Sequence, residues 1–109
     1  MKMWAVEFWE NKKGQRPVED WFADLPKSDK KEIAKLFGLL ELFGYELSLP
    51  HAKNLGGDLY ELRSKSKGAG HRVYYTFQGE KIALLLVAGD KSSQERDIAK
   101  ARNIIRSEL

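Results

Sequence analysis

The chain has 109 residues, of which 42% are hydrophobic and 11% aromatic, with no cysteine and a formal net charge of +3. These totals exclude a disordered chain, a disulfide framework and thiolate metal sites, so we expect one globular domain, residues 1–109, with no metal or other cofactor. Residues 51–76 hold five basic and two acidic side chains, a difference that equals the net charge of the whole chain. This local excess fits either a polyanion-binding surface or a merely solvated one.

The N-terminal stretch "MKMWAVEFWE" has acidic residues within its apolar part, which is not typical of a signal peptide. No apolar run in the sequence approaches the ~20 residues that a membrane-spanning helix needs. We therefore expect a soluble, cytoplasmic protein that makes no contact with a membrane.

A short strand and two helices are predicted for the first half of the chain. Residues 3–9 alternate apolar with smaller or polar side chains, as in a half-buried strand. One helix is predicted between Pro17 and Pro26, and a second begins at a capping Ser28 and stops at Gly44. We expect the apolar side chains of these two helices to form one shared core. The alternative is that their aromatic residues stack on nucleic-acid bases. The apolar residues with helical spacing are Val18, Trp21, Phe22, Leu25, Ile33, Leu36, Phe37 and Leu40.

The second half of the chain is predicted to contain a loop, three strands and a helix. Residues 45–58 hold a proline and two adjacent glycines and are interpreted as the loop. Residues 59–65 and 71–77 are predicted to form a hairpin. The continuous apolar run at 82–88 is typical of a central strand that is covered on both faces.

The last helix is predicted to begin with a capping box formed by Ser92 and Glu95. The elements then follow the order β-α-α-β-β-β-α. We expect an α+β fold with a largely antiparallel four-stranded sheet and its helices packed on one face, which leaves the other face for function.

The predicted hairpin carries two arginines that should face each other. Side chains in strands alternate between faces, so burying Leu62 and Val73 on one face puts Arg63, Arg72 and Tyr74 on the opposite, exposed face. Like charges opposite each other lower the stability of a sheet, so removal of either arginine should leave stability unchanged or slightly higher. An anionic ligand such as a phosphate would relieve this repulsion.

Three stretches of the sequence resemble one superfamily. "PHAKNLGGDLYELR" followed by "HRVYYTF" resembles the RelE/HigB-type toxins of bacterial type II toxin–antitoxin modules, particularly their phage-derived branch. "LLLVAGDKSSQERDIAKAR" is similar to the C-terminal segment of addiction-module killer proteins, and "PVEDWFADLP" fits the helical hairpin of the same superfamily. The resemblance covers nearly the whole chain and implies a RelE-like fold.

The resemblance also implies an activity and partners. The expected activity is that of a metal-independent, ribosome-dependent mRNA endonuclease (an mRNA interferase), in which the 2′-hydroxyl attacks the scissile phosphate in the ribosomal A site and translation stops. The expected partners are mRNA on the 70S ribosome and a cognate antitoxin, expected to be a helix-turn-helix protein.

Particular residues match this chemistry. By resemblance, Lys53 in "HAKNL" matches a lysine that these toxins use at the scissile phosphate, and Lys91 is the basic residue of the killer-protein motif "GDKSSQ". Arginines supply forked donors that suit phosphate. The expected catalytic residues are therefore Lys53, Arg63, Arg72 and Lys91.

Four further residues are expected to support RNA binding: His51, Tyr74, Lys65 and His71. His51 shares the "PH" context of relatives and can act as an acid or a base. His71 has the parity of the core face, so a structural role is its alternative. Relatives often end the last strand with an aromatic residue and paired lysines, whereas this chain has "VAGDK", so the aromatic that stacks on a base is expected to be Tyr74.

Two other functions fit the same fold. One is a non-enzymatic toxin of the gyrase-poison type, in which the basic face docks protein or DNA. The other is an inactive domain that binds an antitoxin as a corepressor. Acid–base groups such as His51 and Lys53 beside the arginines favour the nuclease, because a pure binding surface needs none.

Overall fold

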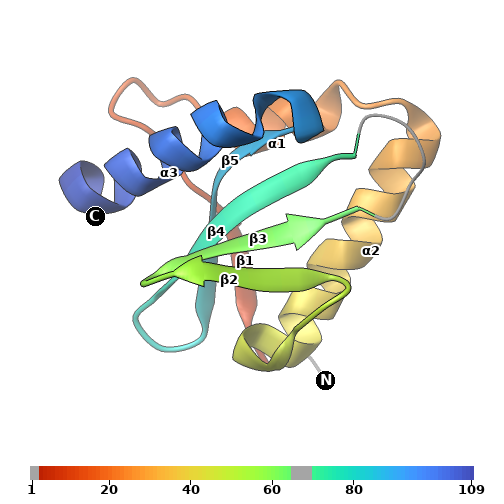
Figure 1. The fold of residues 1–109 in the computed structure, drawn as a ribbon, viewed down its shortest axis with the longest axis horizontal. Helices are drawn as coiled ribbons and strands as arrows, with labels where there is room; N and C mark the ends of the chain where they lie inside the picture. Colours follow the sequence, from red (N-terminus) through yellow and green to blue (C-terminus); the bar gives the residue numbers. More distant parts are fainter. Residues whose placement is uncertain (1–2, 65–69) are drawn as a thin grey trace.

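A mixed β-sheet organises the described part of the chain, which is residues 3–64 and 70–109 in the computed structural model (Figure 1). Within these residues the sheet has five strands in the order β1-β5-β4-β3-β2. The strands are β1 (Ala5–Phe8), β2 (Ala52–Gly56), β3 (Leu59–Arg63), β4 (Arg72–Gln78) and β5 (Ile82–Gly89). The helices are α1 (Pro17–Ala23), α2 (Lys27–Phe43) and α3 (Gln94–Glu108), with short 3-10 turns η1 (Gly44–Glu46) and η2 (Lys91–Ser93).

Strand β5 lies in the interior of the sheet, as its continuous apolar run predicts. It pairs in parallel with β1 and antiparallel with β4. Its side chains alternate between two hydrophobic clusters: Leu85 belongs to the cluster under α1 and α2, whereas Leu84 and Leu86 belong to the cluster under α3. The α+β class and the largely antiparallel sheet are confirmed.

The prediction of four strands is wrong by one. The segment interpreted as a loop contains β2, which pairs antiparallel with β3. Ala52 is buried beside Leu62, whereas Leu55 packs against the cluster on the opposite face, so the segment has the alternation of a strand. The nearby proline and glycines concealed this alternation. As a result, Lys53 lies on a strand, in register with Glu61.

The prediction that all helices pack on one face is also wrong. Helices α1 and α2 cover the face that carries Leu62, Val73 and Tyr75, and α3 packs on the other face with Tyr74 and Leu86 (Figure 1). The physical reason is that β5 is apolar on both faces, and that α3 has an apolar stripe of its own that needs a partner. The face reserved for function is therefore partly covered.

The helical hairpin has the predicted aromatic core. The Phe22 and Phe37 rings lie 5.6 Å apart between their centroids, and Trp21 is half-buried against the same cluster. Trp21 also makes a T-shaped contact with the His71 ring, with centroids 5.6 Å apart. These contacts favour the core role of the aromatic residues over stacking on bases.

Neither predicted helix cap is found in the structure. Helix α2 begins at Lys27, and among the described residues no side chain caps it, so Ser28 is not its cap. The capping box before α3 is formed by Asp90 and Ser93 around η2, with the Asp90 carboxylate accepting from the Ser92 backbone N–H at 2.9 Å. The hydrogen bond that the Ser92 hydroxyl donates to the same carboxylate, together with this backbone one, lowers the pKa of Asp90.

Gly44 ends α2 as predicted, and it does so for two reasons. Its φ is +49°, a conformation that side chains disfavour, and an added Cβ would overlap the indole of Trp4. Gly38, in the interior of α2, has neither constraint, because nothing lies within 4 Å of an added Cβ.

These two glycines make a matched pair of stability tests. Gly44→Ala should lower the free energy of unfolding by at least about 1–3 kcal/mol, the usual cost of such a backbone conformation, with the overlap at Trp4 adding to it. Gly38→Ala should raise it by about 0.5–1 kcal/mol because alanine loses less entropy in a helix. Urea unfolding followed by circular dichroism measures both, and equal effects would contradict the assignment of Gly44 as an obligatory stop.

Candidate functional site

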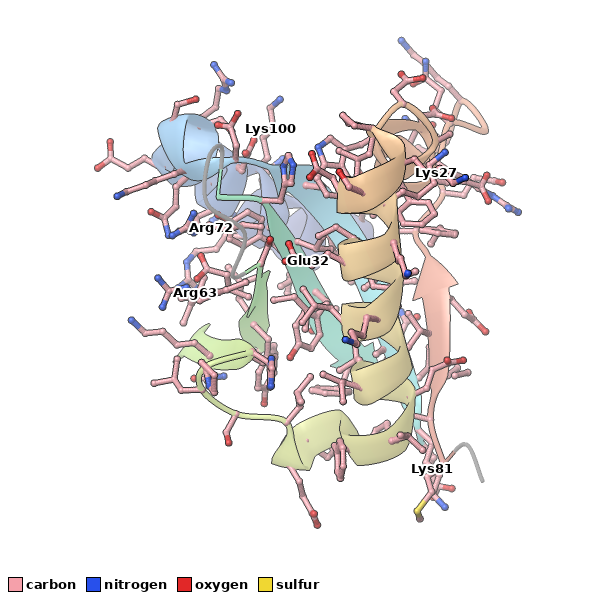
Figure 2. All side chains as sticks on the ribbon, turned by 90° about the vertical axis from the view of Figure 1, so that its right-hand side faces the viewer. Lys27, Glu32, Arg63, Arg72, Lys81 and Lys100 are labelled. Atoms are coloured by element: carbon pink, nitrogen blue, oxygen red, sulfur yellow. The ribbon has the colours of Figure 1, made fainter. Side chains whose placement is uncertain are left out.

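The two arginines face each other across the hairpin, as predicted. Arg63 of β3 is in register with Arg72 of β4, and Leu62 is in register with Val73. Figure 2 shows both arginines on the side of the sheet away from α2. Their exposure differs from the prediction: the side chain of Arg63 is 38% exposed, but Arg72 is only 8% exposed and counts as buried.

A buried carboxylate lies beside the two guanidinium groups. Glu61 is 1% exposed, and it projects from the same face of β3 as Arg63. Its Oε1 lies 3.4 Å from the Nε of Arg63, and its Oε2 lies 3.7 Å from the Nε of Arg72. The repulsion expected between the arginines is therefore offset by an internal anion, without any ligand.

The sequence did not single out Glu61, although a signal was present. Glu61 and Arg63 are two residues apart in a strand, so they share a face. In strand β4, Arg72 and Tyr74 have the same relation, and Glu61 is in register with Tyr74. An acid placed among arginines on one face predicts an ion-pair cluster once the hairpin register is known.

The start of α3 contacts the cluster formed by Glu61, Arg63 and Arg72. Gln94, its first residue, donates from Nε2 to the Oε2 of Glu61 at 2.9 Å. The helix approaches the sheet closely at Gly89, which is in register with Arg72. An added Cβ at Gly89 would overlap the Asp97 carboxylate and the Ser93 hydroxyl, which donates to Asp97 at 2.5 Å. A residue with a side chain at position 89 would therefore displace the helix from Arg72.

Tyr74 is fully buried, so it cannot be the aromatic residue that stacks on a base. Its hydroxyl is enclosed, and among the described residues it makes no hydrogen bond of good geometry. Burial raises the pKa of the Tyr74 phenol well above its usual value, and the nearby carboxylate of Glu61 raises it further. The phenol is therefore a neutral group beside the charged cluster, on the same face of the sheet.

Two lysines lie at the rim of the buried cluster. Lys53 is exposed on β2 and is in register with Glu61, on the same face of the sheet. Lys91 is exposed at the start of η2 and lies beside Gly70, whose carbonyl accepts a hydrogen bond from the Nη1 of Arg72 at 2.7 Å. The fold thus brings Lys53, Arg63 and Arg72 to one face and puts Lys91 just past the end of β5, near the start of β4.

The two histidines lie outside this face. The Nε2 of His71 is 3.2 Å from the Oδ2 of Asp29 on α2, and its ring meets Trp21, which fits its structural alternative. His51 is half-buried, and its carbonyl accepts from the backbone N–H of Arg63 at 2.8 Å. Together with Arg63 and several residues of α2, it lines a groove of about 730 Å³. Lys65 lies outside the described residues.

Two further properties concern the described residues as a whole. No group of three or more histidine, aspartate or glutamate side chains in residues 3–64 and 70–109 is placed to hold a metal ion. Over the same residues, no helix combines the length and the apolar character that crossing a membrane requires.

Comparison with known proteins gives a family match. The family described as "Phage derived protein Gp49-like" (DUF891) matches residues 20–106, a stretch that runs from α1 to α3 and includes every site residue named above. A protein of Haemophilus influenzae described as uncharacterized is 40% identical over 50 residues, which make up 46% of this chain and 50% of that protein. The chain thus matches about half the length of that curated relative.

The buried ion pairs predict unequal effects for the two arginines. Arg72→Ala should lower the free energy of unfolding by about 3 kcal/mol, because it leaves Glu61 buried with one cationic partner fewer. Arg63→Ala should lower it by at most about 1 kcal/mol, because that side chain is partly exposed and its ion pair is weakened by water. Both results would differ from the expectation, based on repulsion between the arginines alone, that removal of either one leaves stability unchanged or slightly higher. Urea unfolding at neutral pH measures them, and no loss of stability in Arg72→Ala would contradict the cluster.

The raised pKa of Tyr74 predicts a loss of stability at alkaline pH. The folded protein keeps the phenol proton where the unfolded chain loses it, so stability is intact below about pH 10 and falls as the pH rises further. Tyr74→Phe should reduce this alkaline loss and leave neutral-pH stability unchanged or up to about 1 kcal/mol higher, because the buried hydroxyl makes no good hydrogen bond. Tyr75→Phe, at a tyrosine whose pKa is also raised by burial but which lies on the other face, is the parallel variant. An alkaline loss unchanged in both variants would refute the prediction.

Proposed function

The chain belongs to the Gp49-like family of phage-derived proteins, a family associated with toxin–antitoxin modules, and on this premise we propose that it is the toxin of such a module. The proposed activity is that of an mRNA interferase of the RelE/HigB type. Its substrate is mRNA in the A site of the 70S ribosome, and its effect is to stop translation.

The proposed reaction needs no metal. The 2′-oxygen of the substrate attacks the adjacent phosphorus, the bond from phosphorus to the 5′-oxygen breaks, and the products are a 2′,3′-cyclic phosphate and a 5′-hydroxyl. Negative charge grows on the phosphoryl oxygens and on the leaving oxygen during this step. Fixed cationic donors around the phosphate therefore stabilise the transition state.

One observation carries the proposal: exposed Lys53 and partly exposed Arg63 share a sheet face with Arg72 buried beside them. Arg63 is the forked donor that a phosphate can reach directly. Arg72 lies deeper, so we assign it the electrostatic support of the site, in surroundings that screen its charge weakly. Lys53 supplies a mobile cation on the neighbouring strand.

The remaining predicted residues receive peripheral roles in this proposal. Lys91 at the rim contacts the RNA backbone. His51 lies beside Arg63 in the groove along α2, where it can contact the nucleotide next to the scissile phosphate. Tyr74 and His71 support the sheet from within.

The proposal implies two partners and a compartment. The ribosome supplies the substrate, which places the protein in the cytoplasm. A cognate antitoxin, proposed to be a helix-turn-helix protein, neutralises the toxin by covering or remodelling the basic face. A translation extract primed with a defined mRNA tests the proposal, with 5′ ends mapped in the presence and absence of ribosomes. The absence of A-site cleavage by the wild-type protein would refute it.

Arg63→Ala and Lys53→Ala should slow single-turnover cleavage on saturated ribosomes by ~10²–10³, the typical cost of losing one transition-state donor. Both variants should still associate with ribosomes, because one phosphate contact contributes little to a large interface. Lys27→Ala removes an exposed lysine at the start of α2, distant from Arg63 in Figure 2, and should cleave at the wild-type rate. If Arg63→Ala cleaves as fast as Lys27→Ala, the basic face is a docking surface and the catalytic assignment is wrong.

A further inference from the structure

We propose that Glu61 is a positioning residue that pairs with the Nε of both arginines, and thereby turns the terminal nitrogens of Arg63 toward the substrate phosphate and fixes the supporting charge of Arg72 beside it. This inference rests on the proposed function, and it assigns to a buried carboxylate a role that packing alone does not require. The same face holds Glu61, both arginines and Lys53.

The contacts of Glu61 come from three separate elements. Within β3, its Oε1 pairs with Arg63, and across the sheet its Oε2 pairs with Arg72 of β4. The same Oε2 accepts a hydrogen bond from Gln94 of α3. Both arginine contacts are ion pairs, and among the described residues the Nε of Arg72 makes no hydrogen bond of good geometry. The Gln94 hydrogen bond and the two ion pairs together restrict the carboxylate, which in turn restricts both guanidinium groups.

The geometry of arginine explains the consequence. A guanidinium group has one donor edge that includes Nε and another formed by the two terminal nitrogens. In Arg72 the Nε faces Glu61 and Nη1 donates to the Gly70 carbonyl, which defines the orientation of the whole group. In Arg63, the ion pair with Glu61 occupies the Nε side and leaves the terminal edge for a ligand.

The presence of a glutamate at this position is informative because burial of a carboxylate lowers the stability of the fold. A buried carboxylate loses its hydration, and well-packed apolar residues in place of such an ion-pair cluster are often as stable or more stable. At 1% exposure, Glu61 has the environment of a core residue. A role in orienting the arginines accounts for the presence of the whole ion-pair cluster at this depth, where apolar residues would pack as well.

Glu61 also affects a bound phosphate in two opposite ways. Its charge has the same sign as the phosphate and lies 3.4–3.7 Å from both Nε atoms, so it weakens the attraction of the site for any anion. Its contacts order the donors that the transition state needs. Removal of the charge should therefore strengthen anion binding and slow the reaction, a combination that simple unfolding does not produce.

The test is Glu61→Gln, which keeps the shape of the side chain and removes the charge. In single-turnover cleavage on ribosomes, its maximal rate should fall on the order of 10- to 100-fold, as for residues that orient a site's ligands. The ribosome concentration needed for half-saturation should not rise. The matched control is Glu80→Gln, which makes the same charge change at an exposed position between β4 and β5 and should behave as wild type. A wild-type rate in Glu61→Gln, or a fall that comes only from weaker binding, would overturn the proposal.

A second measurement does not depend on cleavage, so it separates this inference from the proposed function. Nuclear magnetic resonance of the arginine Nε–H groups, assigned with Arg63→Lys and Arg72→Lys, reports their order directly. Glu61→Gln should broaden or shift both signals and should bind inorganic phosphate more tightly than the wild type. Unchanged arginine signals, or weaker phosphate binding, would count against a positioning role even if the wild type cleaves no RNA.

Gln94→Ala tests the proposal if Glu61→Gln does not fold. It removes the hydrogen bond to Glu61 from a half-buried residue and leaves both ion pairs in place. Its cleavage rate should lie between those of the wild type and the Glu61 variant, and Glu61→Asp, which keeps the charge, should recover part of the rate. Full wild-type cleavage and unchanged Nε–H signals in Gln94→Ala would overturn the claim that the carboxylate must be restricted.

Discussion

Strand β5 presents apolar side chains on both of its faces, and this requirement for two-sided burial shapes the rest of the molecule. One face is covered by α1 and α2, which leaves Leu84 and Leu86 to be covered by another element. Helix α3 follows β5 after the short turn η2, so it returns across the sheet and covers them. Because α3 packs there, the start of the helix also lies over the start of β4, where Arg72 and Tyr74 are buried. The candidate site is thus the part of this face that α3 leaves accessible.

This arrangement decides the electrostatics of the site. A fully open sheet face would leave both arginines hydrated and strongly screened, whereas the cover of α3 puts one of them in a protected environment. The close approach depends on Gly89, where Asp97 and Ser93 occupy the space of a side chain. Burial of Arg72 in turn requires a nearby anion, and Glu61 meets this need from the adjacent strand. Packing of an apolar strand and pairing of a buried charge are therefore parts of the same structural solution.

Period-two alternation was sufficient to predict that Leu62 and Val73 share the buried face of the hairpin. It was also sufficient to place both arginines on one face. It could not give their exposure, which depends on where a helix distant in the sequence packs. The apolar run of β5 contained this information, since a strand covered on both faces is incompatible with helices on one face only. Strand β2 was missed because Pro50 precedes it and two glycines, Gly56 and Gly57, stand at its end, a composition typical of a loop. Its pairing with β3 is a tertiary contact that local composition does not reveal.

The candidate site shows a similar limit of sequence reasoning. Residue types and a resemblance pointed to Lys53 and Arg63, but the role of Tyr74 was misjudged and Glu61 was missed, because both depend on burial. The basic excess of this region explains why the anion was overlooked: counted along the chain, one glutamate among lysines and arginines reduces the net charge only slightly. In three dimensions it lies within 4 Å of both guanidinium groups. The cluster of Glu61, Arg63 and Arg72 thus carries one net positive charge, which makes it stable without a ligand and still attractive to a phosphate. A site built from arginines alone would bind an anion more strongly but would hold its donors less firmly.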